Sequence, residues 1–230
     1  MKKWICALLA LCMAFSLLPF GALAAEDDGE PVVVFAGTCG KTCTFEVTSD
    51  GVMTVRGTGK VGKRKTTYTN KAYTQRVIDE KLVISEGITE IGEDVFNGVD
   101  VKEIVLPDSL KRIGRNAFIT TWFVESITFG SGLETIDEGA FQSCSVRELI
   151  LPESLKTIGN YAFSGCYKLR SAVIFGEVGY GAFSECRVLE SAAVMNATEL
   201  GEQAFANCPM LHELYLSDTI DTIGAALTMV

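Results

Sequence analysis

A phrase of about 22 residues recurs from Ile91 to the end of the 230-residue chain, and it constrains the fold more than any other feature. One phenylalanine per copy marks the phrase, at successive steps of 22, 23, 22, 20 and 22 residues. A fixed period in the twenties is typical of a solenoid, in which each unit buries its apolar face only against its neighbours. Such proteins present a surface rather than a catalytic cleft. The repeated phenylalanines are Phe96, Phe118, Phe141, Phe163, Phe183 and Phe205.

The copies predict two extended stretches joined by turns. In the clearest copy, residues 149–166, an aliphatic run is followed by proline, a second aliphatic stretch and an Ala-Phe pair. Alternation along the first stretch puts its first and third residues in the core and its middle residue on the exposed face. A short helical turn around Ala-Phe then carries the phenylalanine inward, where burial of the ring contributes about 2–3 kcal/mol. The expected fold is a solenoid with a parallel β-sheet and short helical turns.

Residues 32–58 follow a different pattern. Short β-branched and alternating runs surround a turn at Asp50 and Gly51. This pattern predicts a small β-hairpin unit that covers the open end of the solenoid. We expect a β-rich N-terminal cap with a basic loop over residues 26–80, and repeats over residues 81–230 with about six copies and an incomplete last one. Because the last copy stops before its phenylalanine, either the natural protein continues or this end frays.

The first 25 residues, 1–25, have the character of a secretory signal peptide. Two lysines precede an apolar run, Ala22 and Ala24 provide small residues at the cleavage site, and acids follow. A retained membrane anchor is one alternative. Lipid modification of Cys12 is another, but Leu11 is too large for the residue before a modified cysteine. We therefore expect export and cleavage, after which no apolar run is long enough to span a membrane.

The charge of the remaining chain is strongly acidic and unevenly distributed. Without the leader, 18 basic and 29 acidic residues remain, a net charge of −11. Such a chain is not expected to bind nucleic acid or an anionic membrane surface. Between Gly51 and Ile78, however, there are seven bases and no acids.

Six of these bases form a candidate anion-binding loop. An anionic wall polymer or a sulfated glycan is the kind of ligand that such a loop attracts. A neighbouring molecule's acidic solenoid is a further candidate, and a solvated loop that aids solubility is the plainer alternative. The loop residues are Lys60, Lys63, Arg64, Lys65, Lys71 and Arg76.

Six cysteines remain after the leader. Two of them, Cys39 and Cys43, lie in the cap, where a turn can bring them together. The other four recur three residues after the phenylalanine in successive copies. A column along a solenoid does not converge on one point, so a metal site is not expected. Coils about 4.8 Å apart hold Cβ atoms slightly too far apart for a disulfide. We expect buried thiols that fill small apolar spaces, with stacked disulfides as the alternative. The column contains Cys144, Cys166, Cys186 and Cys208.

The sequence offers little to support catalysis. His212 is the single histidine, and it occupies a column in which other copies carry lysine, arginine or glutamate. No nucleophile elbow, phosphate-binding loop or metal-ligand spacing accompanies it. We therefore predict no enzymatic activity and no cofactor, and a hydrolase is the disfavoured alternative.

The repeat phrase of residues 149–166 is similar to the BspA-like leucine-rich repeats of bacterial surface proteins. Residues 37–40, 49–55 and 57–59 resemble the cap that often precedes such repeats, so that the resemblance covers about residues 36–226. It implies a leucine-rich-repeat solenoid, a right-handed superhelix of the α/β type, that is secreted or exposed on a bacterial cell surface and, in some members, adhesive. The chain departs from the family in having no recognisable wall-sorting motif and an unusually basic loop.

Two columns along the repeats form a candidate partner-binding surface. The middle residues of the first stretches are mainly apolar, and the residues just before these stretches are rich in serine and acid. This combination suits a protein-binding surface. The alternative is that β-branched residues simply suit a sheet and stack on their neighbours. The candidate residues are Glu103, Val105, Ser126, Thr128, Glu148, Ile150, Ser171, Val173 and Tyr215.

These features predict a secreted or cell-surface interaction module that binds a protein or a glycan through its exposed sheet face. A structural module that spaces or displays other parts of a longer surface protein is the alternative, and the truncated last copy favours it.

Overall fold

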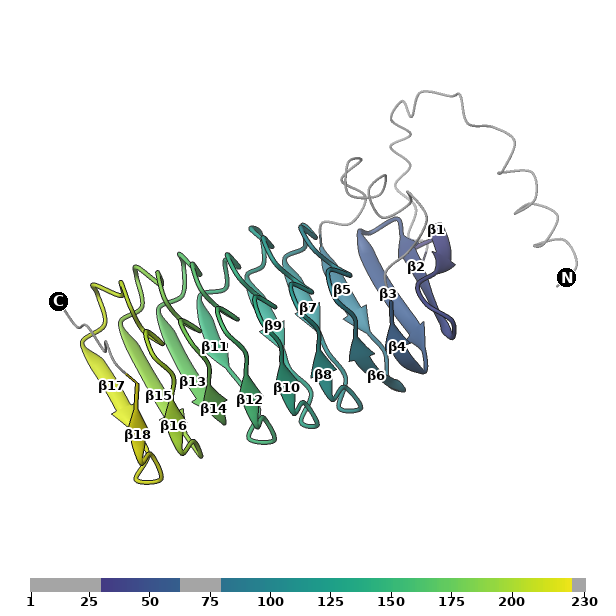
Figure 1. Ribbon diagram of the computed structural model, residues 1–230. Helices are drawn as coiled ribbons and strands as arrows, with labels where there is room; N and C mark the ends of the chain where they lie inside the picture. The colour runs from purple at the N-terminus through teal and green to yellow at the C-terminus, as the bar shows by residue number, and fades with distance from the viewer. Residues whose placement is uncertain (1–29, 63–79, 225–230) are drawn as a thin grey trace, which may run out of the picture. The chain divides into compact units, whose positions relative to one another are not determined.

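The computed structural model describes residues 30–62 and 80–224, and Pro31–Val230 form one compact unit. In this unit successive coils stack side by side, and each coil contributes one strand to each of two faces (Figure 1). We call these the strand face and the second face. The expected signal peptide and five of the six loop bases lie outside the described residues.

Three strands open the unit: β1 (Val33–Thr38), β2 (Cys43–Thr48) and β3 (Val52–Gly57). The strands β1 and β2 pair antiparallel, as do β2 and β3, which confirms the antiparallel cap. The strand β3 also pairs in parallel with β5 (Lys81–Ile84). The last strand of the cap is therefore already a rung of the strand face, so the cap continues the solenoid's sheet.

The strand face continues through parallel strands from β5 onward. They are β7 (Glu103–Val105), β9 (Ser126–Thr128), β11 (Glu148–Ile150), β13 (Ser171–Phe175), β15 (Ser191–Met195) and β17 (Glu213–Leu216). The ladder runs unbroken from β3 to β9 and again from β11 to β17. It is interrupted between β9 and β11.

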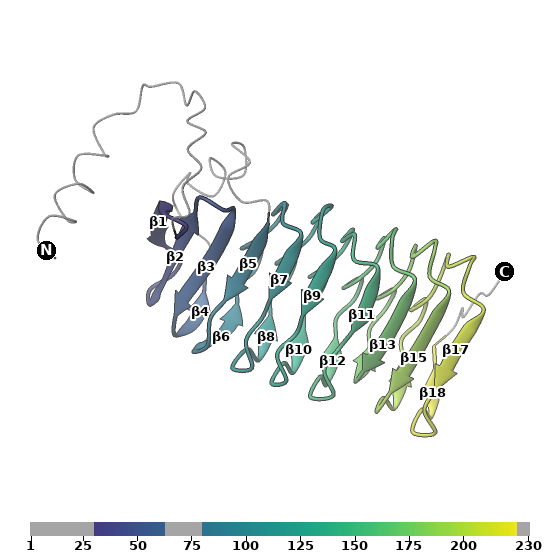
Figure 2. The same cartoon turned by 180° about the vertical axis from the view of Figure 1, so that it is seen from behind.

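The second face is a single parallel sheet of eight strands without such an interruption (Figure 2). Its strands are β4 (Gly59–Val61), β6 (Ile88–Ile91), β8 (Arg112–Ile113), β10 (Thr135–Ile136), β12 (Thr157–Ile158), β14 (Glu177–Val178), β16 (Glu199–Leu200) and β18 (Thr222–Ile223). The coils therefore stay in register on this face at the level where the strand face is interrupted.

The repeated phenylalanines form the centre of the core. Successive rings stack with centroids 5.1 to 5.5 Å apart and planes inclined by 3° to 16°. The predicted alternation is also confirmed, since Ile104 and Leu106 are buried and Val105 faces outward, half-buried. Beside the interruption, Ile127 and Phe129 are only partly buried. The recurring phenylalanine is thus core, as its column predicted.

The expected short helical turns are absent from the described residues, which is a correction to the predicted fold. The segment around Ala117 and Phe118 forms successive tight turns, and Asn116 has a φ of 52°, outside the helical region. The backbone N–H of Phe118 donates to the carbonyl of Ala140 on the next coil at 2.8 Å. In a helix this N–H would bond within its own segment. Bonding between coils therefore replaces the helix.

The shortened fifth copy has a simple local cause. A single residue, Gly176, joins β13 to β14, whereas β11 and β12 are separated by the longer segment 151–156. The backbone N–H of Gly176 donates to the carbonyl of Met195 at 3.1 Å, which keeps the short connection in contact with the next coil. The predicted trimming of a turn is therefore confirmed.

The column cysteines are buried free thiols, as the spacing of the coils predicted. The thiols of Cys166, Cys186 and Cys208 each donate to the carbonyl of the phenylalanine of the preceding coil, at 3.4, 3.3 and 3.2 Å. Burial raises the pKa of Cys144. Hydrogen bonding to Cys166, followed by burial, raises the pKa of Cys186. These side chains are therefore neutral fillers of the core.

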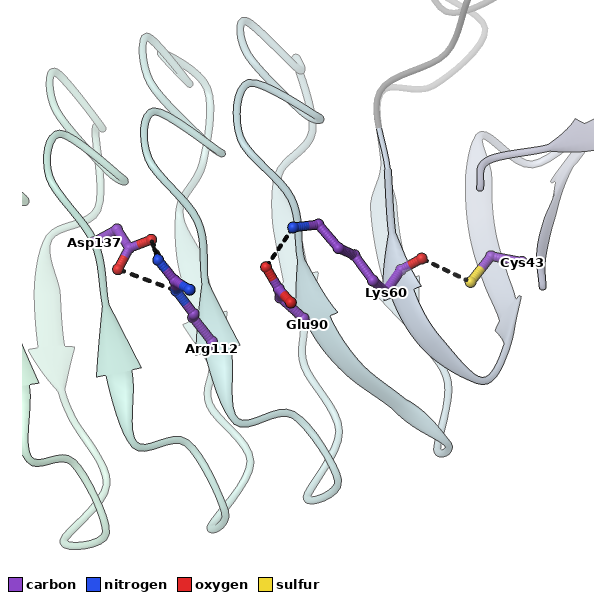
Figure 3. A network of polar contacts seen from close by, with 5 residues as sticks. All are labelled: Cys43, Lys60, Glu90, Arg112 and Asp137. Carbon is purple, nitrogen blue, oxygen red and sulfur yellow. Dashed lines mark hydrogen bonds and ion pairs between the residues drawn. The ribbon is translucent and has the colours of Figure 1, made fainter. Parts of the chain in front are cut away.

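In the cap, the backbone N–H of Cys39 donates to the carbonyl of Cys43 at 2.9 Å. A turn therefore brings the two cysteines together, and both are buried. The thiol of Cys43 donates to the carbonyl of Lys60 at 3.4 Å (Figure 3).

Candidate functional site

The strand face presents the predicted outward residues in register. Glu148 pairs with Ser171 and Ile150 with Val173 across β11 and β13. The side chain of Ile150 is 71% exposed, whereas Val173 is half-buried. A large apolar side chain at this level of exposure is available to a partner.

Three strands of this face surround an open depression of about 220 Å³. Ala193 forms the floor of this depression. Its small side chain faces outward between Val173 on β13 and Tyr215 on β17, and therefore leaves the depression open. The ring of Tyr215 is 58% exposed and forms one side of the depression. Ser171, Ser191 and Glu213 supply polar groups, so the lining is mainly apolar with a few polar atoms.

The depression contains only part of the predicted surface. It includes Ser171, Val173 and Tyr215. Glu148 and Ile150 lie beside it on β11. The remaining predicted residues lie on β7 and β9, beyond the interruption of the ladder, and the structure does not bring them to the depression. They are Glu103, Val105, Ser126 and Thr128.

Some of the charged side chains that the sequence predicted to contact partners already form ion pairs with neighbouring coils. The Nζ of Lys81 lies 3.0 Å from Oε1 of Glu103, so this predicted residue is already paired. On the second face, Nη2 of Arg112 lies 2.8 Å from Oδ2 of Asp137 (Figure 3). Hydrogen bonding to Asp137, followed by its charge, raises the pKa of Arg112. Exposed pairs of this kind contribute about 0–1 kcal/mol each and mainly align the coils.

The candidate anion-binding loop is described at one residue only. The Nζ of Lys60 lies 2.6 Å from Oε1 of Glu90, which makes it part of this ion-pair pattern (Figure 3). Binding of an anionic wall polymer or sulfated glycan by the loop stays a prediction. The loop bases outside the described residues are Lys63, Arg64, Lys65, Lys71 and Arg76.

The surroundings of His212 give no catalytic arrangement. Its Nδ1 lies 2.9 Å from the carbonyl oxygen of Met210, and the ring is exposed. Over residues 30–62 and 80–224, no three His, Cys, Asp or Glu side chains gather so as to hold a metal ion. Across the same residues there is no helix long and apolar enough to cross a membrane.

Two surface features were missed by reasoning from the sequence. One is a groove of about 450 Å³ on the second face, to which Glu177, Tyr180 and Glu202 contribute. The carboxylate of Glu177 accepts hydrogen bonds from the backbone N–H groups of Thr198 and Glu199, at 2.8 to 3.1 Å, so it joins two coils. The sequence signal for this groove was the shortened fifth copy, in which Gly176 alone connects β13 to β14 beside Glu177.

The other missed feature lies at the corners where coils enter the strand face. Trp122 and Phe123 are 54% and 58% exposed there, although their hydrophobicity alone favours the core. The signal in the sequence was the distance from Phe118 to the start of the next strand, β9. This distance is one residue longer than the equivalent distance in the copies before and after.

The fold and its open strand face define a repeat scaffold that displays a surface. The BspA type leucine rich repeat region matches residues 66–178 and 111–227, in six copies. The chain therefore belongs to the family of BspA-type leucine-rich repeat proteins, which confirms the resemblance seen in the sequence. Comparison with curated proteins finds no match.

A solved structure shows the same fold. A leucine-rich repeat protein from Bacteroides ovatus is 23% identical, with a TM-score of 0.61 over 82% of this chain and 56% of that chain. The chain thus spans little more than half the length of that protein. A leucine-rich repeat protein of T. pallidum is 20% identical, with a TM-score of 0.45 over 73% of this chain and 87% of that chain.

Proposed function

We propose that this chain is a secreted or cell-surface interaction module of a bacterium that binds a protein partner over the depression on β13, β15 and β17. The observation that supports this proposal is the outward row Val173, Ala193 and Tyr215, where a small residue between two larger ones leaves an open apolar hollow. Membership of a repeat family built around displayed surfaces supports the same conclusion.

The physical basis is desolvation of an exposed apolar surface. Tyrosine is enriched at protein interfaces because it buries a large ring while its hydroxyl stays hydrogen-bonded. A partner side chain that fills the hollow contacts Tyr215 and Val173 and displaces water from both. The serines and Glu213 at the edge then provide polar contacts that fix orientation.

The test is capture of the chain from residue 26 onward by immobilised host matrix proteins and purified wall polymers. Val173→Asp places a charge in the hollow and Tyr215→Ala removes one side of it. We expect each to weaken capture at least about tenfold, as hot-spot substitutions do. Val105→Asp is the matched control, because Val105 is the equivalent outward residue on β7, away from the depression.

Unfolding in urea shows whether each variant keeps its fold. If folded Val173→Asp and Tyr215→Ala capture as well as the parent chain, the depression is not the binding site. If no immobilised protein captures the parent chain, the chain is better described as a structural spacer.

A further inference from the structure

Three successive corners differ in length, and this difference exposes aromatic rings. The corner at 144–146 has one residue fewer than those at 121–124 and 166–169. The side chain of Tyr167 crosses the short corner, and its hydroxyl donates to the carbonyl of Trp122, two coils away, at 3.4 Å. The rings of Trp122, Phe123 and Tyr167 are 54%, 58% and 44% exposed. Three exposed aromatic side chains thus lie on two corners of the same edge, on either side of the short corner.

Two cations without ion pairs stand on the same corners. Within residues 80–224, eight of the ten lysines and arginines form an ion pair, and the two that do not are Arg147 and Lys168. The Nζ of Lys168 lies 5.6 Å from the centroid of the Tyr167 ring, within the range of a cation–π contact. Arg147 directly follows the short corner. We call Trp122, Phe123, Arg147, Tyr167 and Lys168 the corner patch.

The missing ion pair at Arg147 has a structural cause. Glu125 precedes β9 and Arg147 precedes β11, so they hold equivalent positions on successive coils. At equivalent positions elsewhere, Lys102 pairs with Glu80, and Arg170 pairs with Glu190. The ladder is interrupted between β9 and β11, and among the described residues Arg147 has no acidic partner there. A cation that the fold leaves unpaired, in a chain of net charge −9, is available to an anionic ligand.

We propose that the corner patch binds a linear acidic saccharide whose sugar rings carry carboxylates. The flat C–H faces of pyranose rings pack on exposed aromatic rings without the need for a deep pocket, and the guanidinium of Arg147 matches a carboxylate with two hydrogen bonds. Coils lie about 4.8 Å apart, close to the length of one sugar ring in a chain. A saccharide that runs along the stack therefore presents one ring to each corner in turn.

This ligand class fits the corner patch better than an acidic peptide does. A carboxylate-bearing peptide satisfies the two cations but offers no flat apolar face at each step along the chain. The patch is also separate from the depression around Ala193, which has no lysine or arginine in its lining. The two proposals can therefore fail independently.

Trp122 provides the measurement. The chain has two tryptophans, Trp4 and Trp122, so a protein that begins at residue 26 reports from Trp122 alone. Titration with hexagalacturonate is expected to shift and quench its fluorescence in a saturable manner. The double variant R147Q/K168Q should raise the dissociation constant about fivefold or more, and Phe123→Ala should weaken binding as well.

The matched control is the double variant K111Q/K156Q. It removes the same charge from two lysines that both pair with Glu134 near the second face, and it should leave the dissociation constant unchanged. Val173→Asp should also bind hexagalacturonate normally, because it alters the other site. Neutral maltohexaose and poly-glutamate of equal charge should each bind at least about fivefold more weakly than hexagalacturonate.

Three outcomes would overturn the proposal. The first is no change in Trp122 fluorescence at millimolar hexagalacturonate. The second is equal binding by poly-glutamate, which would make the patch a general carboxylate or acidic-peptide site. The third is undiminished binding by R147Q/K168Q that unfolds in urea like the parent chain.

Discussion

The hydroxyl of Ser145 donates a hydrogen bond to the carbonyl oxygen of Val124 at 3.0 Å, immediately before the level at which β9 and β11 fail to pair. Both residues are buried. The backbone N–H of Ser145 also donates to the carbonyl of Thr121 at 3.2 Å. The short corner is therefore attached to the preceding coil partly by the side chain of Ser145. It lies next to strands β9 and β11, which form no backbone ladder with each other.

Ser145→Ala should lower the free energy of unfolding by about 1–3 kcal/mol, because it leaves the buried Val124 carbonyl without its hydroxyl donor. Urea unfolding followed by circular dichroism measures the change. Ser154→Ala is the control, since the hydroxyl of Ser154 donates to Leu133 at 2.7 Å but is partly exposed, so that water can replace it. If Ser145→Ala and Ser154→Ala lower the free energy of unfolding equally, the hydrogen bond from Ser145 to Val124 contributes no more to stability than the partly exposed one.

Phe141→Ala should be far more destabilising, by about 3–5 kcal/mol. The ring of Phe141 is fully buried and stacks between Phe118 and Phe163, with centroids 5.1 and 5.2 Å away. Its removal leaves a cavity that both neighbouring coils line. Urea unfolding is again the measurement, and Tyr161→Ala, which truncates a ring that is 40% exposed, should cost much less. A similar cost for both would contradict the assignment of the phenylalanine column as the core.

The period and the alternation of the repeats were sufficient to predict most of this fold. A phenylalanine such as Phe141 recurs at a fixed step only if each coil places it against the previous one. Strand register follows from the same step, which is why Glu148 and Ser171 were assigned to one column and are found paired. The antiparallel cap was also predictable, because its turn residues and alternation are local signals.

The helical turns were predicted wrongly because the competing interaction is not local. The sequence around Asn116 and Phe118 suits a short helix, but the N–H of Phe118 bonds to Ala140 on the next coil. Whether a backbone N–H bonds within its own segment or to the neighbouring coil depends on the spacing of the coils. Local helix propensity gives no information about that spacing.

The candidate site was predicted only in part. The outward column placed Val173 and Tyr215 correctly, but the hollow depends on the small side chain of Ala193 between them. The corner patch was missed because residues such as Trp122 lie in none of the repeated columns from which the surface was predicted. Trp122 and Phe123 are exposed on a corner that is one residue longer than the next corner. This difference produces an aromatic surface only when the coils are stacked.

Gly176→Ala should destabilise the shortened copy strongly. The φ of Gly176 is 80°, and an added Cβ would lie 2.6 Å from the carbonyl oxygen of Leu155. Gly59→Ala is a matched control, because its φ is 77° but no atom lies within 4 Å of the added Cβ. We expect Gly59→Ala to cost roughly 1–2 kcal/mol from the backbone conformation alone. Gly176→Ala should cost at least about 2 kcal/mol more, from the close approach of coils.

Equal costs in urea unfolding would show that the segment at Leu155 moves away from the added methyl group without loss of stability. A milder effect at position 176 than at position 59 would contradict the tight connection between β13 and β14.

The buried thiols should make stability fall at alkaline pH. Burial raises the pKa of Cys144 in the folded chain, so the folded state holds its proton where the unfolded state has lost it. The folded state then binds more protons, and the free energy of unfolding falls as pH rises above about 8.5, the usual thiol pKa. Each such thiol contributes a slope of up to about 1.4 kcal/mol per pH unit.

Urea unfolding of the parent chain and of Cys144→Ala, between pH 7 and pH 10, isolates this effect because the other titrating groups are common to both. The parent chain should lose stability more steeply than Cys144→Ala above pH 8.5, and the two slopes should agree below it. The thiols should also resist aromatic disulfide reagents until the chain unfolds, since the thiolate is the reactive form and the folded core holds the neutral thiol. Parallel slopes throughout, or rapid modification of Cys144 in the folded chain, would contradict its burial in the core.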